Sequence, residues 1–300
     1  MDAEAFREHL EYPRGRGDVP PASFSGVAGG AACGDLVRID LALEGDRVAA
    51  SGFEASGCGA AIAAGSAAVA LVEGARVLDA ARVGTEAIAA ELGGLSPGKL
   101  HAADLAADAL HVALGAAVAA AGALTPGPAR TLVAMSGGVD SAVAALLVAR
   151  EGRETVTVTL ELWRDAANDA EASCCSAHAV RLARSVAHRM ELPHFTLDLR
   201  AAFAAGVVAP FLADHAAGLT PNPCVRCNGS VRLDAMVAFA DRLGAAALAT
   251  GHYARLHDDR LRLAEDREKD QTYMLAATPR ATLARLRFPL GDLRKDQVRA

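Results

Sequence analysis

The residues best suited to chemistry form the string 136–141, Ser-Gly-Gly-Val-Asp-Ser. It follows an apolar stretch, 131–135, and precedes a helical pattern, 142–150. Glycines let backbone N–H groups close around phosphate oxygens, and a helix N-terminus favours negative charge. The string lacks Gly-Lys-Ser/Thr, so it is not a Walker loop. We predict a site for nucleotide phosphates, in which Asp140 binds Mg²⁺ or caps the helix. The alternative is a capped helix after a glycine turn.

A pair of cysteines lies in 222–228, Asn-Pro-Cys-Val-Arg-Cys-Asn. Asn-Pro favours an extended or turned backbone, so we expect Cys224 and Cys227 on a loop just ahead of a helix that begins at Ser230. A nearby helix N-terminus and Arg226 favour thiolates, which attack electrophiles and carry persulfide sulfur. The alternative is half of a zinc or iron–sulfur site. Its other ligands would be Cys174, Cys175 and His178.

The pattern of predicted helices and strands changes at 122–128, Gly-Ala-Leu-Thr-Pro-Gly-Pro. We interpret this segment as a linker between two domains. Before it, a predicted hairpin (36–43, 47–54) and helices (60–72, 85–92, 100–121) indicate a small α+β domain at 1–121. After it, strands and helices alternate, which predicts a parallel, doubly wound α/β sheet for 129–300. The predicted strands are 131–135, 155–160, 194–199 and 245–250, and the helices 142–150, 180–190 and 230–243.

The composition narrows the class of protein. The 300 residues are 52% hydrophobic and 22% charged, with a net charge of −6, which argues against non-specific coating of DNA. The composition does not exclude an RNA-processing enzyme with one local basic face. The candidate cations for such a face are Arg226, Arg232, Arg255, Lys269, Arg294, Lys295 and Arg299. A polar N-terminus and the lack of a long uninterrupted apolar run predict a cytoplasmic protein without a membrane partner. There, the six cysteines favour metal or catalytic roles over disulfides.

The loop 136–141 resembles the SGGxDS motif of the PP-loop ATP pyrophosphatases, which split ATP at the α-phosphate. With it, residues 129–300 resemble the bacterial tRNA 2-thiouridylase family (MnmA type). The matching pieces are 134–141, Cys174-Cys175-Ser176, 222–228, 250–254 (Thr-Gly-His-Tyr-Ala), 269–271 (Lys-Asp-Gln) and 288–291 (Phe-Pro-Leu-Gly). The resemblance implies thiolation of C2 of the wobble uridine of tRNA, in which the uridine oxygen is adenylated and persulfide sulfur then displaces AMP.

The same resemblance implies roles by position. Cys227 matches the catalytic nucleophile, and Cys224 stands where many members have aspartate. ATP would be bound by Ala134, Met135, Ser136, Gly137, Gly138, Val139, Asp140, Ser141, Leu160 and Gly251. The tRNA would be bound by Asn222, Pro223, Cys224, His252, Lys269, Asp270 and Gln271. ATP and Mg²⁺ are the expected cofactors. The expected partners are tRNA and a persulfide donor, either a cysteine desulfurase or a sulfur relay protein.

The sequence stops at Ala300, before the second catalytic cysteine and C-terminal β-barrel that the family normally has. We expect either that the sequence is a fragment, or that Cys224 or another cysteine serves as the second thiol.

Residues 1–121 resemble the NifU/IscU iron–sulfur scaffold family. The matching pieces are 12–15 (Tyr-Pro-Arg-Gly), 32–35 (Ala-Cys-Gly-Asp), 57–61 (Gly-Cys-Gly-Ala-Ala) and 99–106. The ligands implied by position are Cys33, Asp35, Cys58 and His101, and Ala102 replaces the third cysteine. Two thiolates with His and Asp suit zinc or a labile cluster; the alternative is a degenerate scaffold kept for docking or sulfur relay.

Together these observations predict an ATP-dependent tRNA sulfurtransferase joined to a scaffold-like domain. Two other functions stay open. One is a PP-loop ligase with a small-molecule acceptor, and the other is an iron–sulfur or zinc carrier whose ATP-binding half is inert.

Overall fold

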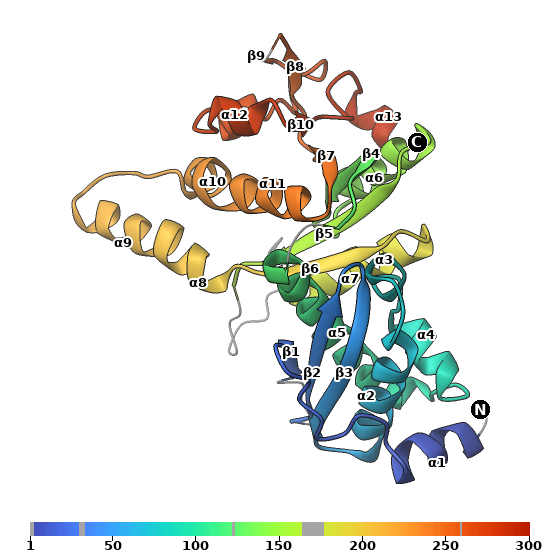
Figure 1. The fold of residues 1–300 in the computed structure, drawn as a ribbon. Helices are drawn as coiled ribbons and strands as arrows, with labels where there is room; N and C mark the ends of the chain where they lie inside the picture. The colour runs from blue at the N-terminus through green and yellow to red at the C-terminus, as the bar shows by residue number, and fades with distance from the viewer. Residues whose placement is uncertain (1–2, 30–33, 122–123, 164–176, 259) are drawn as a thin grey trace. The chain divides into compact units, whose positions relative to one another are not determined.

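The computed structural model describes residues 3–29, 34–121, 124–163, 177–258 and 260–300 (Figure 1). The chain forms two compact units, residues 1–124 with 191–197, and residues 125–190 with 198–300. Each unit has its own sheet and buried core.

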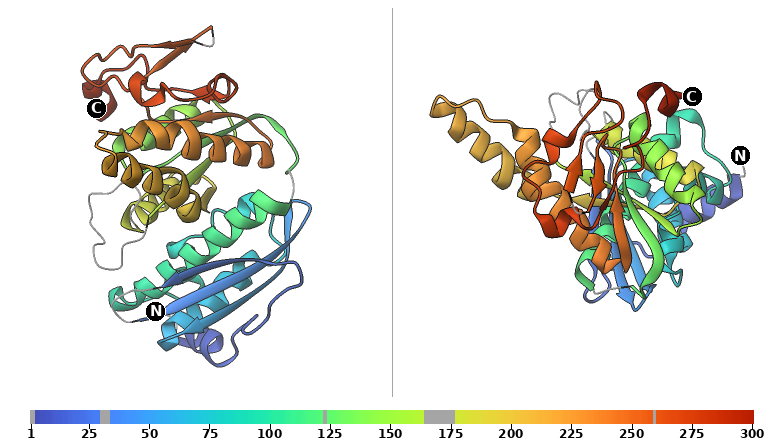
Figure 2. Two further views of the ribbon diagram at one scale, coloured as in Figure 1. Left: turned by 90° about the vertical axis from the view of Figure 1, so that its left-hand side faces the viewer. Right: turned by 90° about the horizontal axis from the view of Figure 1, so that it is seen from above.

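The first unit contains a three-stranded antiparallel sheet in the order β1-β2-β3. The strands are β1 (Phe24–Gly29), β2 (Leu36–Glu44) and β3 (Arg47–Ser56). The helices are α1 (Ala3–Glu11), α2 (Gly59–Val72), α3 (Val77–Ala80), α4 (Thr85–Glu91) and α5 (Leu100–Ala121). Helix α5 packs along β1 and β2 while α2 packs on β3 and α5, so alanine-rich helix faces build the core against the sheet (Figure 2).

Among the described helices, one is long and apolar enough to cross a membrane. It spans Pro97–Ala120, and 72% of its apolar stretch is buried. Because this segment contains α5, which packs on β1, β2 and α2, it is the core helix of the first unit.

A second sheet has five strands in the order β10-β7-β4-β5-β6. Its first four strands belong to the second unit, whereas all of β6 but its last residue falls in the segment 191–197 that groups with the first unit. The strands are β4 (Gly127–Ala134), β5 (Thr155–Glu161), β6 (His194–Asp198), β7 (Ala245–Ala249) and β10 (Leu286–Arg287). The pairs β4–β5, β4–β7 and β7–β10 are parallel. All seven residues of β5 are buried, as expected for a strand covered on both faces. The predicted doubly wound α/β class, preceded by a small α+β domain, is confirmed.

The second unit also contains helices, of which some pack on this sheet. They are α6 (Val139–Arg150), α7 (Ala177–Arg189), α8 (Arg200–Phe203), α9 (Ala209–Ala216), α10 (Pro223–Cys227), α11 (Leu233–Arg242), α12 (Arg280–Leu283) and α13 (Lys295–Arg299). Helix α6 packs on β4 and β5, α7 on β5, and α11 on β7 and β4. A small hairpin, β8 (Arg255–His257) with β9 (Arg260–Arg262), follows β7.

The chain order of the strands reverses direction between β4 and β7. From β4 the chain moves outward through β5 to β6, and it then returns to the other side of β4 through β7 and β10. In open parallel sheets, ligands bind at the carboxyl ends of the strands at such a switch point. We therefore expect a ligand site at the loops that follow β4 and β7.

Candidate functional site

The loop that follows β4 is held closed by its own serines. The Ser141 hydroxyl donates to the carbonyl of Gly138 at 2.8 Å and accepts from the backbone N–H of Ser136 at 3.1 Å. Gly137 has a φ of +75°, and a Cβ there would lie 2.9 Å from the carbonyl oxygen of Ala179, so the turn requires glycine. No side chain caps the N-terminus of α6 at Gly138. The first N–H groups of α6 therefore keep the free donors that suit a phosphate.

Asp140 does not cap the helix, which corrects one of the two roles predicted for it. The N-cap position is Gly138, and the Asp140 carboxylate instead accepts from Lys295 Nζ, at 2.5 and 2.7 Å, and from the Tyr253 hydroxyl at 3.0 Å. Burial and the Asp140 carboxylate raise the pKa of the Tyr253 hydroxyl, so it remains a hydrogen-bond donor. A lysine charge thus already neutralises Asp140, and Mg²⁺ at this carboxylate would have to replace it.

The loop after β7 lies against the first turn of α6. A Cβ on Gly251 would lie 2.9 Å from the carbonyl carbon of Asp140 and from the Ser141 nitrogen, so only glycine allows this approach. His252 follows, with its Nδ1 2.8 Å from the Thr250 hydroxyl. Burial, with a smaller contribution from the positive charge of Arg232, lowers the pKa of His252 to about 4, so its ring is neutral near pH 7.

These two loops form the walls of one pocket of about 190 Å³. Its lining joins residues from the carboxyl ends of β4 and β7 with the last residue of the cysteine motif and the helical residues after it. They are Ala134, Met135, Ser136, Asp140, Ser141, Asn228, Arg232, Leu233, Met236, Thr250, Gly251, His252 and Gln271. The pocket lies at the switch point of the sheet, and it brings together several residues predicted to bind ATP with His252, predicted to contact tRNA.

The cysteine motif is helical, which corrects the predicted loop. Helix α10 begins at Pro223 because proline is tolerated at the first helical position, and the Asn222 side chain caps it. Asn222 Oδ1 accepts from the backbone nitrogens of Cys224 and Val225 at 3.0 and 3.3 Å. Cys224 is exposed in the first turn, whereas Cys227 is 7% exposed at the end of the helix. A π-helical segment, Asn228–Arg232, then leads into α11.

The three residues predicted to contact tRNA after the hairpin differ in what they do. Lys269 is exposed. Asp270 accepts from the backbone of Ala264 at 2.8 Å and from the Thr272 hydroxyl, and Gln271 Oε1 accepts from the backbone nitrogen of Tyr253 at 3.0 Å. Gln271 therefore braces the loop after β7, and Asp270 braces the segment that follows β9. Lys269 is the cation of the three, and it is exposed.

Other predicted residues lie away from this pocket. Leu160 is buried near the carboxyl end of β5 and does not line it, and Val139 is 56% exposed in the first turn of α6. Cys33, Cys174 and Cys175 lie outside the described residues, whereas His178 is exposed at the start of α7. The zinc or cluster alternative built on Cys174 and Cys175 therefore cannot be placed.

A larger pocket of about 770 Å³ lies beside the hairpin β8–β9. It contains none of the residues predicted to bind ATP, so the smaller pocket is the better nucleotide site. Its lining includes four arginines, Arg255, Arg262, Arg267 and Arg287. Arg255 is ion-paired with Glu265 and Asp292, and Arg287 with Glu151. Arg262 and Arg267 are exposed cations of the kind that attract phosphate groups.

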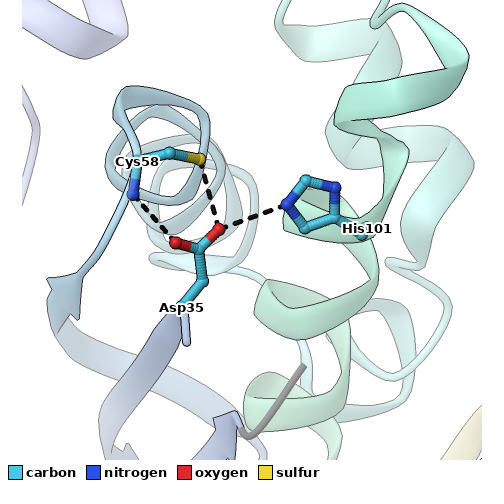
Figure 3. A group of neighbouring side chains, drawn as sticks. All are labelled: Asp35, Cys58 and His101. Atoms are coloured by element: carbon cyan, nitrogen blue, oxygen red, sulfur yellow. Dashed lines mark hydrogen bonds and ion pairs between the residues drawn. The ribbon is translucent and has the colours of Figure 1, made fainter. Parts of the chain in front are cut away.

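In the first unit, three of the predicted ligands converge (Figure 3). Asp35 Oδ, Cys58 Sγ and His101 Nε2 all lie within 4.8 Å of one another. Asp35 Oδ1 accepts from the backbone nitrogen of Cys58 at 2.9 Å, and Oδ2 lies 3.2 Å from both Cys58 Sγ and His101 Nε2. Ala102, next to His101, is fully buried and offers no ligand.

The hydrogen bonds of His101 suit a cation. Its Nδ1 lies 3.0 Å from the carbonyl oxygen of Gly98, which requires Nδ1 to be protonated. In the neutral ring, Nε2 then presents a lone pair to the carboxylate of Asp35, and these two repel unless a proton or a metal lies between them. A histidine whose other nitrogen is fixed by a carbonyl is typical of metal ligands. The set of O, S and N donors fits zinc better than a cluster, which prefers thiolates.

The fold and the two sites define the class: a nucleotide-binding α/β domain preceded by a scaffold-like α+β domain. Residues 129–300 match the family described as "tRNA methyl transferase HUP domain", and residues 2–120 match "NifU-like N terminal domain". The first match covers more than half of the chain, and the chain belongs to the tRNA methyl transferase HUP domain family, with a NifU-like domain before it.

Curated relatives match the same two parts. A "Bifunctional protein NifU/MnmA" from Rubrobacter xylanophilus is 47% identical over 97% of this chain and 62% of its own length. Proteins named "tRNA-specific 2-thiouridylase MnmA" match 57% of the chain: that of Acidithiobacillus ferrooxidans is 45% identical over 48% of its length, and that of Thermus thermophilus is 46% identical over 49%. The chain thus spans about three fifths of the bifunctional relative and half of the others.

Several residues of the second unit's site were not assigned a role from the sequence, among them Lys295, Tyr253, Asn228 and Arg232. Lys295 and Arg232 were noted only as cations, and Asn228 only as the last residue of the cysteine motif. Their shared location depends on contacts between elements far apart in the chain, which no local pattern encodes.

Proposed function

We propose that the second unit adenylates a uridine of tRNA at its C2 oxygen and replaces that oxygen with sulfur carried by Cys227. The observation that supports this most is the shared pocket. It is lined both by the loop 136–141, which follows β4, and by the segment that directly follows Cys227. ATP would activate O2 and the sulfur would attack C2, so both must reach the same C2–O2 bond and a common pocket is a requirement of the chemistry. The named activities of the relatives support the same reaction.

The reaction would proceed in three steps. The uridine O2 attacks the α-phosphorus of ATP, and the bond to the β-phosphate breaks as pyrophosphate leaves. The terminal sulfur of a persulfide on Cys227 then attacks C2, and AMP leaves with the former O2. A second thiol attacks the Cys227 sulfur, which releases thiouridine and leaves a disulfide for a thiol reductant to reopen.

Several of these roles have a candidate among the chain's own residues. The uncapped N-terminus of α6 would hold phosphate oxygens. Cys224 is our candidate for the second thiol, because it lies three residues before Cys227 on the same short helix. The donor of the persulfide would be a cysteine desulfurase or a relay protein. Lys269 and the exposed Arg262 and Arg267 beside β8–β9 would attract the tRNA backbone.

The test is pyrophosphate release by the full chain with ATP, Mg²⁺ and tRNA transcripts. We expect release to require a transcript with uridine at the wobble position and to fall strongly with Ser141→Ala, which removes the hydroxyl that holds the loop 136–141 closed. Thionucleoside analysis after addition of a persulfide donor would then show 2-thiouridine with the unaltered chain and none with Cys227→Ser. Stimulation of pyrophosphate release by a small molecule and not by tRNA would overturn the proposal in favour of another PP-loop ligase.

For the first unit we propose that Asp35, Cys58 and His101 hold a zinc ion, with Cys33 as the fourth ligand. The convergence of three ligand atoms around one carboxylate supports this. Metal analysis of the purified chain should show about one zinc per chain, lost with Cys58→Ser. Iron and acid-labile sulfide in place of zinc would instead favour a cluster carrier, and retention of the metal by Cys58→Ser would contradict the site.

A further inference from the structure

The pocket of the second unit contains a buried hydrogen-bond acceptor that nothing in the described part of the chain satisfies. Asn228 is 4% exposed and lines the pocket, and its Oδ1 has no partner among the described residues. Its amide nitrogen is oriented by a bond to the carbonyl of Met274 at 3.4 Å, so the free atom is the oxygen. A buried amide oxygen without a partner costs free energy, which a ligand donor would recover.

One helical turn further on, the same pocket contains a buried donor without a partner. Arg232 lines the pocket, and its Nε has no acceptor among the residues that the structure describes. Both residues belong to the π-helical segment Asn228–Arg232, and segments of this kind often occur at functional sites. The pocket therefore offers an acceptor and a donor from one short segment, opposite the loop of Ser136 and Ser141.

With N3 of the base toward Asn228 and position 4 toward Arg232, an acceptor followed by a donor matches a uracil and not a cytosine. Uracil presents N3–H, a donor, beside the carbonyl O4, an acceptor. Cytosine presents N3 as an acceptor beside an amino group, which is the reverse pattern. Enzymes that act on a base read its Watson–Crick edge with such side chains after the base has left the stack.

The neighbouring asparagine is not available for this task. The Oδ1 of Asn222 already accepts from the nitrogens of Cys224 and Val225, so it caps α10. Asn228 directly follows Cys227, the residue from which sulfur would be delivered. A base held by its N3–H and O4 edge would leave O2 free to attack ATP.

We propose that Asn228 and Arg232 determine the specificity for uracil, Asn228 Oδ1 accepting from N3–H and Arg232 Nε donating to O4. This inference rests on the proposed function and adds the residues that read the base. It predicts that the enzyme recognises the edge formed by N3–H and O4, so that a methyl group on N3 of the target uridine weakens recognition although the rest of the tRNA is unchanged.

The experiment measures pyrophosphate release by the full chain with three transcripts that differ only at the target base: uridine, 3-methyluridine and cytosine. We expect the unaltered chain to prefer uridine by roughly 10- to 100-fold in kcat/KM over either alternative, the size expected for one lost bond to a buried group. Asn228→Leu, which has similar size and no acceptor, should lower kcat/KM for uridine and bring the uridine to 3-methyluridine ratio close to one.

Two further variants distinguish a loss of base recognition from a loss of folding. Asn228→Asp keeps an acceptor oxygen and should retain most of the preference for uridine over 3-methyluridine. Arg232→Met should lower kcat/KM for the uridine transcript without raising kcat/KM for the cytosine transcript. In each variant the KM for ATP, measured at saturating tRNA, should change less than kcat/KM for tRNA. A circular dichroism melt identifies any variant that fails to fold.

The outcomes distinguish this inference from the function on which it rests. If the unaltered chain releases no pyrophosphate with the uridine transcript, the proposed function fails, and this inference fails with it. If the unaltered chain is active and Asn228→Leu keeps the full preference for uridine over 3-methyluridine, the proposed function stands and the assignment of Asn228 is overturned.

Discussion

Lys295 and Asp140, which are 155 residues apart in the sequence, form a close ion pair in which Nζ lies 2.5 and 2.7 Å from the two carboxylate oxygens. The pair is partly buried, with exposures of 22% and 35% for the two side chains. It joins α13 to the first turn of α6, the turn that follows the phosphate-type loop. A carboxylate so near a phosphate site would repel the nucleotide, and the lysine removes that charge.

The first prediction concerns this pair. We expect Lys295→Met to raise the KM for ATP by about 10- to 100-fold, because losing a charged hydrogen bond costs about 1.5–3 kcal/mol and leaves Asp140 uncompensated beside the phosphates. The measurement is ATP-dependent pyrophosphate release at saturating tRNA. Arg294→Met, a change at the exposed neighbouring residue, is the matched control and should leave the KM for ATP unchanged.

A double variant shows whether the unpaired charge of Asp140 causes the rise in the KM for ATP. In the Lys295→Met background, Asp140→Asn removes the unpaired carboxylate and should recover part of the ATP affinity. If Asp140 is instead required as a Mg²⁺ ligand, the double variant will be worse than Lys295→Met alone. An unaltered KM in Lys295→Met would show that the ion pair is irrelevant to ATP binding.

The second prediction separates two roles of Asn222. The resemblance assigns Asn222 to the target base, whereas the structure shows its Oδ1 capping α10. Loss of an N-cap typically costs about 1 kcal/mol, and aspartate caps as well as asparagine does. We therefore expect Asn222→Ala to impair thiouridine formation and Asn222→Asp to retain it, measured by thionucleoside analysis. Equal impairment by both variants would favour contact of the Asn222 amide group with the base.

Sequence reasoning predicted the parts of the fold whose signals are local. The strand–loop–helix at 131–150 follows from an apolar run, two glycines and a helical pattern, and the structure places β4 and α6 there. Asp35, Cys58 and His101 were identified through motifs, and the structure brings them together. The strand–loop–helix could be predicted because few neighbouring residues determine its conformation. The three ligands come from segments far apart in the chain and were found through the family resemblance, and their binding of a metal stays a prediction.

Other elements were missed for physical reasons. Strand β1 has the sequence Phe-Ser-Gly-Val-Ala-Gly, whose glycines disfavour a strand, and its pairing with β2 and packing on α5 override that preference. Helix α10 was predicted as a loop because Asn-Pro was interpreted as extended, whereas asparagine at the N-cap followed by proline also begins helices. The meeting of Lys295, Tyr253 and Asp140 depends on tertiary packing alone.

The third prediction tests the geometry of the metal site through a residue that is not a ligand. Gly57 has a φ of +129°, and a Cβ there would lie 2.0 Å from Asp35 Oδ1. Gly57→Ala must therefore displace the carboxylate around which the three ligand atoms gather. We expect zinc retention after dialysis against a chelator to fall to the level seen with Asp35→Ala. The matched control is Gly74→Ala, which also has a positive φ, +74°, but no atom within 4 Å of the added Cβ.

If both glycine variants lose zinc equally, backbone strain and not the position of Asp35 explains the loss. If Gly57→Ala retains zinc as the unaltered chain does, the Asp35 carboxylate is not a ligand. Thermal melts of both variants show whether the first unit remains folded.

The last prediction follows from the neutral ring of His252. Its pKa of about 4 in the folded chain lies below its ordinary value of 6.5, because burial and, to a smaller extent, Arg232 disfavour the imidazolium. Between these values the unfolded chain binds a proton at His252 and the folded chain does not. The free energy of unfolding is therefore intact above about pH 6.5 and falls as the pH decreases toward 4, by on the order of 2–3 kcal/mol.

His252→Asn removes this dependence, because asparagine does not titrate and can still contact the Thr250 hydroxyl. Urea unfolding at pH 7.5 and pH 4.5, for the unaltered chain and for the variant, gives the difference attributable to His252, since all other groups titrate in both proteins. We expect the unaltered chain to lose about 2–3 kcal/mol more than the variant between the two pH values. Equal losses would mean that His252 takes up a proton in the folded chain as readily as in the unfolded one, and the pocket would then carry an additional positive charge beside Arg232 at mildly acidic pH.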